Sequence, residues 1–248
     1  AYRNITMLRT LGVLGGMGPL ATASFMNQVI ALSPAKNDQE HIPMFIRNIP
    51  QIPDRTNFLM GIEDENPFFE LKKGFNQLTS LGVSCIVIPC NTAHYWYNAL
   101  TQNADVHTIS IVQSVIKRAK ATGKRKVGIL ATTATLNMRI YQTAFSKHNI
   151  EFIEPNEQQQ TFIMQGITAV KSGDLTSGHN LLKQSYELML AHGADTVLFG
   201  CTEIPLVLNE QVFNSPDTCL DTIAILAQEC VNWAYTSTQQ STHLFSSV

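Results

Sequence analysis

The sequence contains one pattern twice, and this repetition is the feature that most restricts its fold. In each copy an apolar run leads into a cysteine and then into a segment of helical character. Residues 83–88 precede Cys90, and residues 195–199 precede Cys201. Short apolar runs of this kind are typical of strands buried in a parallel sheet. The sequence therefore predicts an α/β fold with each thiol at the carboxyl end of a strand, where such folds bind ligands.

Predicted strands and helices alternate along the chain, and the alternation starts again near residue 126. In the first series the strands are expected at 11–14, 44–46, 83–88 and 106–110, and the helices at 19–32, 67–81 and 92–102. In the second series the strands are expected at 126–130, 150–153 and 195–199, and the helices at 137–147, 158–171 and 176–192. The separation of Gly12 from Cys90 is close to that of Gly128 from Cys201, so the halves form a quasi-repeat.

This repeat predicts two parallel-sheet lobes with a ligand site in the cleft between them. We expect an N-terminal lobe of residues 1–112 plus 221–248 and a C-terminal lobe of residues 113–220. The segment 112–124 is expected to carry the chain across as a helix, and 221–236 to form a closing helix that returns to the first lobe. Cys90 and Cys201 would then face each other.

Composition narrows the class of protein. A chain of 248 residues with 44% apolar content can bury a sizeable core. Its 17 basic and 19 acidic residues leave a net charge of −2, which does not favour nucleic acid or an anionic membrane as partner. The start lacks the long apolar segment of a signal peptide, and no apolar run reaches 18 residues. We expect a soluble, cytoplasmic protein that acts on a small molecule.

The cysteines indicate reduced thiols. Their number, five, is odd, and no CxxC spacing or zinc pattern accompanies them, so no metal is expected. Cys85, Cys219 and Cys230 are most simply core residues. A thiol that faces a helix N-terminus has its anion stabilised, which can lower a cysteine pKa below its usual value of about 8.5. Cys90 and Cys201 in such settings suggest a base and an acid on opposite faces of one carbon. The alternative is two buried structural thiols.

Five motifs, in this order, resemble those of the cofactor-independent aspartate/glutamate racemases, and within them the aspartate branch. The motifs are Gly15-Gly-Met-Gly-Pro-Leu-Ala-Thr22, Gln51-Ile-Pro-Asp-Arg-Thr56, Pro89-Cys-Asn-Thr-Ala-His94, Leu130-Ala-Thr-Thr-Ala-Thr135 and Gly200-Cys-Thr-Glu203. The resemblance covers about residues 9–232. It implies two Rossmann-like lobes related by pseudo-twofold symmetry, an isomerase of amino-acid metabolism that works without pyridoxal phosphate, and a homodimer. It also implies that Cys90 and Cys201 are the catalytic pair.

The resemblance further implies that Arg55 and Lys171 bind substrate carboxylates, and it adds Thr132 and Thr135 to the expected binding residues. Position alone would make Arg55 a surface arginine and Lys171 a solvated lysine near a helix end. The residues just after the thiols and in the first glycine-rich turn are placed to contact a small ligand through backbone N–H groups, hydroxyls or pocket lining. They are Met17, Asn91, Thr92, Ala93 and Thr202. Ordinary helix capping is an equally good account of the threonines.

Two departures from the glutamate racemase pattern favour aspartate as substrate. Gly16-Met17 stands where that enzyme usually has Asp-Ser, and Glu203 stands where it has histidine. Ala134 replaces a glycine found in some aspartate racemases. The roles of Asp54, His94 and Glu203 remain open: each can serve the site or only the local structure.

Other functions compete with this one. The segment from Gly16 to Ala21 matches the dinucleotide fingerprint GxGxxA, but that function needs an acidic residue near position 48, where the chain has Asn48. A glutamate or broad-specificity racemase and a non-catalytic dicarboxylate-binding protein remain as alternatives. Decarboxylases and cis–trans isomerases of related fold often use one cysteine, so the presence of two argues against them.

Overall fold

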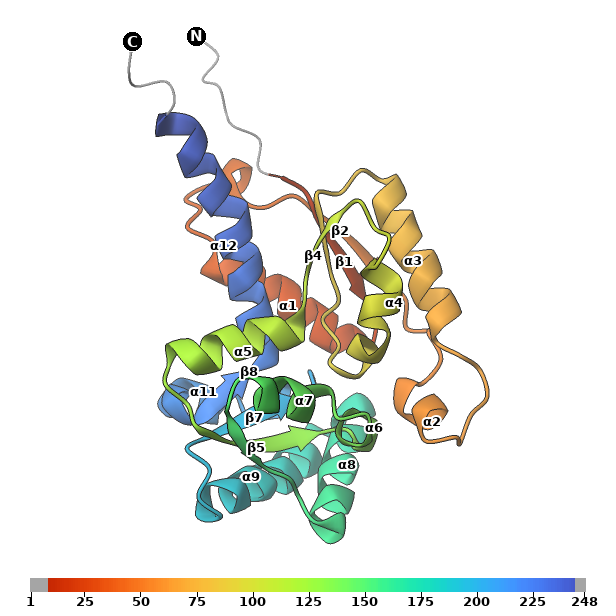
Figure 1. Cartoon of the computed structure of the whole chain (residues 1–248), viewed down its shortest axis with the longest axis vertical. Coiled ribbons are helices and arrows are strands. Elements are labelled where there is room, and N and C mark those ends of the chain that lie inside the picture. Colours follow the sequence, from red (N-terminus) through yellow and green to blue (C-terminus); the bar gives the residue numbers. More distant parts are fainter. Residues whose placement is uncertain (1–8, 244–248) are drawn as a thin grey trace.

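The computed structural model describes residues 9–243, with side chains described up to residue 236 (Figure 1). The described residues form two four-stranded parallel sheets. The first has the order β2-β1-β3-β4, from β1 (Leu11–Gly15), β2 (Met44–Asn48), β3 (Cys85–Val87) and β4 (His107–Ile109). The second has the matching order β6-β5-β7-β8, from β5 (Lys126–Ala131), β6 (Glu151–Ile153), β7 (Thr196–Gly200) and β8 (Cys219–Asp221). The predicted two-lobed α/β fold is confirmed.

Burial explains why the apolar runs form strands. Every residue of β1 and of β7 is buried, as expected for central strands that helices cover on both faces. In the first sheet β1 pairs with β3, with Leu11 opposite Cys85. In the second sheet β5 pairs with β7, with Val127 opposite Thr196. β3 and β7 therefore occupy the same position in their respective sheets. Cys90 and Cys201, which follow these strands, lie at equivalent strand ends in the two lobes.

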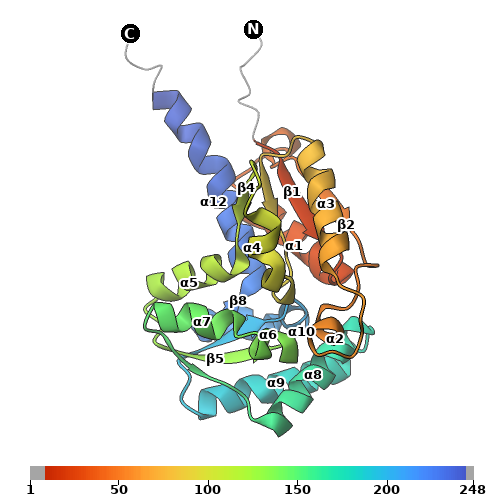
Figure 2. The same cartoon turned by 45° about the vertical axis from the view of Figure 1, so that its right-hand side comes forward.

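Helices cover both sheets (Figures 1 and 2). The first sheet is flanked by α1 (Pro19–Leu32) and α3 (Phe68–Ser80), and its loops carry α2 (Arg55–Leu59), the 3-10 helix η2 (Thr92–Trp96) and α4 (Tyr97–Thr101). The second sheet is flanked by α5 (Ile111–Ala121), α7 (Ile140–Lys147), α8 (Glu157–Lys171) and α9 (Leu175–Ala191), and its loops carry α6 (Thr133–Asn137), α10 (Ile204–Val207) and α11 (Asn209–Asn214). Short 3-10 segments lie at Asp38–Glu40 and Pro216–Thr218.

The last helix, α12 (Thr222–His243), begins directly after β8 and packs against α1 and α5 (Figure 1). The largest apolar cluster lies around these three helices and includes Phe25, Val115, Tyr141 and Leu226, all of them fully buried. Because this cluster contains residues that flank both sheets, one continuous core joins the lobes. Burial of large side chains in such a core contributes about 1.5–3 kcal/mol for each residue.

There are two smaller apolar clusters, one in each lobe, and each one includes a thiol of the predicted pair. Cys90 packs with Met17, Ile88 and Trp96, while Cys201 packs with Phe199 and other residues near α8 and α9. Cys85 and Cys230 are fully buried core residues, as predicted, and Cys219 is half-buried. Each thiol of the pair is therefore anchored in its own lobe.

Some local predictions were wrong. The helix expected at 92–102 is a 3-10 helix followed by α4. The helix expected at 137–147 is present as α7 but begins only at Ile140, after Arg139, whose φ of 51° is left-handed. The turn expected at 131–135 already contains the start of α6, because the Thr132 side chain accepts a hydrogen bond from the Thr135 N–H and caps it. No glycine or proline marks these breaks, so composition gave no signal for them. β8 and the short helices α10 and α11 were not predicted.

Candidate active site

The carboxyl ends of the strands in the two sheets surround a small closed cavity of about 30 Å³. Its lining is Met17, Asp54, Arg55, Thr56, Cys90, Asn91, Thr92, Thr132, Lys171, Cys201, Thr202 and Glu203. Of the predicted binding residues, Ala93 and Thr135 are fully buried behind this lining, and all the others are part of it. The structure thus brings Cys90 of the first lobe and Cys201 of the second lobe into one cavity.

The cavity has room for about one or two water molecules, which is less than an amino acid needs. A second cavity of about 440 Å³ adjoins it and shares Asp54, Arg55, Lys171 and Glu203 with it. The structure is therefore a closed form of the site. A ligand as large as an amino acid must displace these side chains or separate the lobes slightly.

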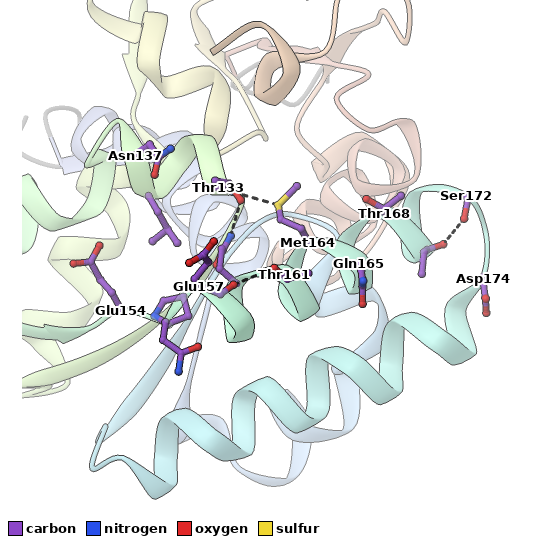
Figure 3. A pocket seen from close by; sticks show the side chains of 15 residues that line it. Thr133, Asn137, Glu154, Glu157, Thr161, Met164, Gln165, Thr168, Ser172 and Asp174 are labelled. Atoms are coloured by element: carbon purple, nitrogen blue, oxygen red, sulfur yellow. Dashed lines mark hydrogen bonds between the residues drawn. The ribbon is translucent and has the colours of Figure 1, made fainter. Parts of the chain in front are cut away.

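A much larger concave surface lies elsewhere on the molecule (Figure 3). It has a volume of about 870 Å³ and lies along α8, with Glu154, Glu157, Met164 and Asp174 among its lining residues. Neither Cys90 nor Cys201 borders it. The paired thiols therefore line a cavity that is smaller than this surface but more enclosed.

Glu203 organises the side of the cavity that belongs to the second lobe. Its Oε2 atom lies 3.0 Å from Cys201 Sγ, which donates to it, and its Oε1 atom lies 2.9 Å from Lys171 Nζ. The backbone N–H of Gly18, from the first lobe, also donates to Oε1 at 3.2 Å. Glu203 is only 3% exposed. Thr202 Oγ1 donates to Oε2 as well, at 3.4 Å. A buried carboxylate with these four donors is well satisfied, and the donor from Gly18 crosses between the lobes.

The sequence predicted a lowered pKa for the Cys201 thiol, but this arrangement raises it. Burial and the Glu203 carboxylate raise the pKa of Cys201 well above its usual value, and the opposing influence of Lys171 is smaller. The helix that follows, α10, has four residues and supplies little dipole. Burial by itself would lower the pKa of Lys171, but the charge of Glu203 and the hydrogen bond to it raise it overall. Lys171 is therefore a cation paired with a carboxylate in the closed form.

Cys90 is held through its backbone. His94 Nδ1 lies 2.7 Å from the Cys90 carbonyl oxygen, and His94 Nε2 accepts the Ile111 N–H at 3.0 Å. Burial lowers the pKa of His94 to about 4, so the ring is neutral and its Nδ1–H donates to Cys90. The open question about His94 is resolved in favour of a buried residue that supports the site.

Three threonine hydroxyls meet across the cleft. Thr92 Oγ1 of the first lobe lies 2.9 Å from Thr132 Oγ1 and 3.0 Å from Thr135 Oγ1 of the second lobe, and the last two lie 2.9 Å apart. Thr132 also caps α6, so the capping role is established for this residue. Thr92 and Thr132 in addition line the cavity, where their hydroxyls can exchange these mutual bonds for bonds to a ligand.

Asn91, next to Cys90, is fixed by a buried network. Its Nδ2 donates to Thr222 Oγ1 at 3.0 Å, and Tyr141 OH donates to its Oδ1. Thr222 Oγ1 in turn donates to the Phe199 carbonyl oxygen of β7 at 2.9 Å. The Asn91 side chain therefore ties the Cys90 loop to the second lobe.

Arg55 is the first residue of α2, and only some of its guanidinium N–H groups donate hydrogen bonds. Nη1 donates to the carbonyl oxygens of Ile52 and Pro53 at 3.1 and 2.9 Å. The Nε atom is buried without a hydrogen-bond partner among the described residues. Asp54 caps α2 by accepting the Asn57 N–H at 2.8 Å. An unsatisfied buried donor beside the cavity favours an anionic ligand.

The glycine-rich turn after β1 allows close approach of the backbone. Gly16 has a φ of 102°, and a Cβ there would lie 2.4 Å from the backbone of Ile49. A Cβ on Gly18 would lie 3.0 Å from Glu203 Oε1. Because the carboxylate of Glu203 occupies the space in front of this turn, a dinucleotide pyrophosphate is disfavoured there, in agreement with the missing acidic residue at position 48.

Sequence reasoning did not find the role of Gly18 or the contacts of the Glu203 carboxylate. The only signal was the spacing of the Gly-Cys-Thr-Glu motif, which places Glu203 two residues after Cys201 without showing where its carboxylate points. Within residues 9–236, no group of three or more His, Cys, Asp or Glu side chains is arranged to hold a metal ion. None of the described helices is both long and apolar enough to span a membrane.

Comparison with known proteins identifies the family of this chain. Residues 14–230 match the model of the family described as Asp/Glu/Hydantoin racemase. The broad specificity amino-acid racemase RacX of Bacillus subtilis is 30% identical over 230 residues, which cover 90% of this chain and 96% of that protein. The aspartate racemase of Picrophilus torridus superposes with a TM-score of 0.82 at 27% identity, covering 91% of this chain and 94% of that one.

A more distant structure shows the same fold. The glutamate racemase of Francisella tularensis, solved in complex with D-glutamate, superposes with a TM-score of 0.64 at 19% identity, covering 93% of this chain and 82% of that one. The family match extends over most of the chain and includes both strand ends that carry the thiols, Cys90 and Cys201. This chain belongs to the Asp/Glu/Hydantoin racemase family.

Proposed function

We propose that the protein interconverts L- and D-aspartate without pyridoxal phosphate, with Cys90 and Cys201 as the two acid–base groups. The observation that carries this proposal is the pair of thiols, one from each lobe, in a single closed cavity that also contains Arg55 and Lys171. A racemase must remove a proton from one face of the α-carbon and return one to the other face. Groups on two opposing lobes suit that requirement.

The remaining groups have roles that follow from their positions. General acid–base catalysis contributes about 10²–10⁴-fold, so the negative charge that develops on the substrate carboxylate needs separate stabilisation. The free Nε–H of Arg55 and the hydroxyls of Thr92 and Thr132 are available donors. We propose that Arg55 binds one substrate carboxylate, and that Lys171 contacts the other after its bond with Glu203 loosens. Met17, Asn91, Ala93, Thr135 and Thr202 complete the proposed binding residues.

Aspartate is favoured over glutamate by Gly16-Met17 in place of the Asp-Ser pair and by Glu203 in place of histidine. The similarity to the Picrophilus aspartate racemase supports the same choice. The alternative is a broad-specificity racemase, which the 30% identity to the Bacillus protein over nearly its whole length supports.

The test is chiral analysis of aspartate incubated with purified, pyridoxal-free protein in deuterated water. Formation of the other enantiomer with deuterium at the α-carbon is expected from either starting enantiomer. Cys90→Ala and Cys201→Ala should each abolish racemisation, while Cys219→Ala, at a half-buried position outside the cavity, should retain it. Absence of both deuterium incorporation and the second enantiomer would exclude the racemase. Calorimetric binding of aspartate without turnover would indicate a binding protein instead.

A panel of other amino acids separates the two racemase proposals. A kcat/KM for aspartate at least tenfold above that for glutamate and for neutral or basic amino acids is expected. Comparable values across the panel would establish broad specificity. For any true racemase the kcat/KM values of the two enantiomers must be equal, because their equilibrium constant is one. This equality provides an internal check on each measurement.

We further propose that the protein is a cytoplasmic homodimer whose first lobe comprises residues 1–112 and 221–248 and whose second lobe comprises 113–220. The packing of α12 against α1 supports this division. Light scattering after size-exclusion chromatography tests the dimer, and cell fractionation tests the location. Limited proteolysis that cleaves first near residue 112 or 221 would support the lobe boundaries.

A further inference from the structure

The two thiols of the cavity have different electrostatic surroundings. Cys201 Sγ donates a hydrogen bond to Glu203 Oε2 over 3.0 Å, and that carboxylate is almost completely buried. Among the described residues no acidic side chain forms a hydrogen bond with Cys90 Sγ. The other carboxylate that lines the cavity, Asp54, accepts the Asn57 N–H at the start of α2. The two sides of the cavity therefore differ in charge: within the described part of the chain a carboxylate contacts Cys201 but not Cys90, although the two strand ends are equivalent in the fold.

Geometry restricts what Glu203 can do. Both of its oxygens have partners: Oε1 accepts from Lys171 and Gly18, and Oε2 accepts from Cys201 with Thr202 Oγ1 at 3.4 Å. The ion pair with Lys171 favours the ionised carboxylate. An ionised carboxylate can only accept hydrogen bonds, so the proton in the Cys201–Glu203 contact belongs to sulfur. Loss of that proton would place a thiolate against a carboxylate in a buried site, which is unfavourable.

We propose that Glu203 is a positioning residue that keeps Cys201 as a protonated thiol aimed into the cavity, so that in the resting enzyme Cys201 is the proton donor and Cys90 the proton acceptor. This inference rests on the proposed racemase function for its catalytic meaning. It assigns different resting roles to two residues that the repeat makes equivalent.

The proton balance of the reaction follows from this assignment. For the enantiomer whose α-proton faces Cys90, Cys90 removes that proton and becomes a thiol, while the electron pair of the C–H bond passes to the α-carbon and its carboxylate; the other enantiomer follows the same steps in reverse. Cys201 gives its S–H proton to the opposite face of that carbon and becomes a thiolate beside Glu203. Repulsion between these two anions favours protonation of Cys201 by water, and Cys90 releases its proton to water, which restores the resting state.

A purely structural role for Glu203 is the competing explanation, because its bonds to Gly18 and Lys171 also connect the two lobes. Both roles predict that substitution of Glu203 lowers activity. They differ in the ionisation of Cys201: the positioning role requires the negative charge, and the structural role requires only the hydrogen bonds. A measurement of thiol ionisation therefore separates them.

The first test is a pH titration of protein labelled with ¹³C at cysteine Cβ, whose chemical shift follows ionisation of the thiol and needs neither substrate nor activity. Cys201→Ala identifies the signal. In Glu203→Gln, which keeps the size and an acceptor but removes the charge, the pKa of Cys201 should fall by about one unit or more. Glu203→Asp should remain close to the wild type, and Lys171→Met should shift the pKa upward. Glu210→Gln, at an exposed position on α11, is the matched control and should leave the signal unchanged.

The second test is the pH profile of kcat/KM for aspartate. The alkaline limb reports loss of the proton from the donor thiol, so it should move to lower pH in Glu203→Gln and stay in place in Glu203→Asp. Equal Cys201 titration in Glu203→Gln and in the wild type would overturn the assignment. A shifted Cys201 signal without racemisation by the wild type would instead refute the proposed function and leave the ionic role of Glu203 standing.

Discussion

His94 connects the Cys90 loop to the start of the helix that crosses between the lobes: its Nδ1 donates to the Cys90 carbonyl oxygen over 2.7 Å, and its Nε2 accepts the Ile111 N–H over 3.0 Å. A neutral imidazole satisfies both bonds, whereas the protonated ring would set its Nε2–H against the Ile111 N–H. The ring also stacks on Tyr97 with centroids 5.1 Å apart. The position of Cys90 thus depends on the protonation state of His94.

We expect His94→Gln to show a pH-dependent loss of stability. The folded-state pKa of His94 is about 4, against 6.5 for an ordinary histidine, so between these values the unfolded chain binds the extra proton. The histidine contribution is therefore complete above pH 6.5 and is lost as the pH falls to 4, a change of about 3 kcal/mol in the free energy of unfolding. Urea unfolding at several pH values should show a deficit for the variant that is largest at pH 7 and shrinks towards pH 4.

His148→Gln, at an exposed position after α7, is the control for this experiment. It should follow the wild type at every pH. A deficit in His94→Gln that is constant between pH 4 and pH 7 would contradict a buried neutral histidine.

Asp221→Asn should have the opposite pH dependence. Asp221 Oδ1 accepts the N–H groups of Ile223 and Ala224 at the start of α12, but burial outweighs these bonds and raises its pKa from 3.8 to about 6. Between these values the folded chain binds the extra proton, so the contribution of Asp221 to the free energy of unfolding falls by about 3 kcal/mol as the pH rises from 4 to 6. Asparagine keeps the acceptor without titrating. The stability of the variant relative to the wild type should therefore rise over this range.

The same urea experiments measure this difference, with the exposed Asp217→Asn as control. Because the His94 and Asp221 contributions have opposite signs in overlapping pH ranges, they largely cancel in the wild type. If Asp221→Asn parallels the wild type between pH 4 and 6, Asp221 does not have the raised pKa that its burial implies.

Thr92→Val should weaken both the site and the contact between lobes. The substitution removes the hydrogen bonds to Thr132 and Thr135 but keeps the shape of the side chain and leaves the bond between those two threonines intact. We expect the free energy of unfolding to fall by about 1–2 kcal/mol and kcat/KM for aspartate to decrease. Thr122→Val removes an exposed hydroxyl bond to the Arg118 carbonyl oxygen at the C-terminal end of α5 and should change neither quantity. Wild-type stability in Thr92→Val would show that the hydroxyls do not hold the cleft closed.

Arg55→Lys should raise the KM for aspartate by about 10- to 100-fold, because lysine keeps the positive charge but loses the planar set of donors that binds a carboxylate at two points. Initial rates across a range of aspartate concentrations give this value. The exposed Arg118→Lys is the control. A KM within twofold of the wild type would mean that Arg55 is not the carboxylate ligand.

Local patterns in the sequence were sufficient for the architecture. Apolar runs such as β1 and β7 are buried on both faces, so their composition identifies them as central strands without knowledge of their neighbours. The repeated strand–cysteine–helix order then placed Cys90 and Cys201 at equivalent strand ends. The family resemblance also predicted that Arg55 and Lys171 belong to the site, and both line the cavity. Short elements such as α6 and α10 escaped prediction because one turn of helix is too short to show a period.

What the sequence determined by itself is the order of the elements and the location of the thiols, since both depend on residues that are close along the chain. The tertiary structure alone decided the chemistry of each thiol. Glu203, Lys171 and Gly18 come from separate segments and both lobes, and their contacts form only when the lobes pack together. Burial then sets the direction of the pKa shift at Cys201, and burial is a property of the whole fold rather than of any segment.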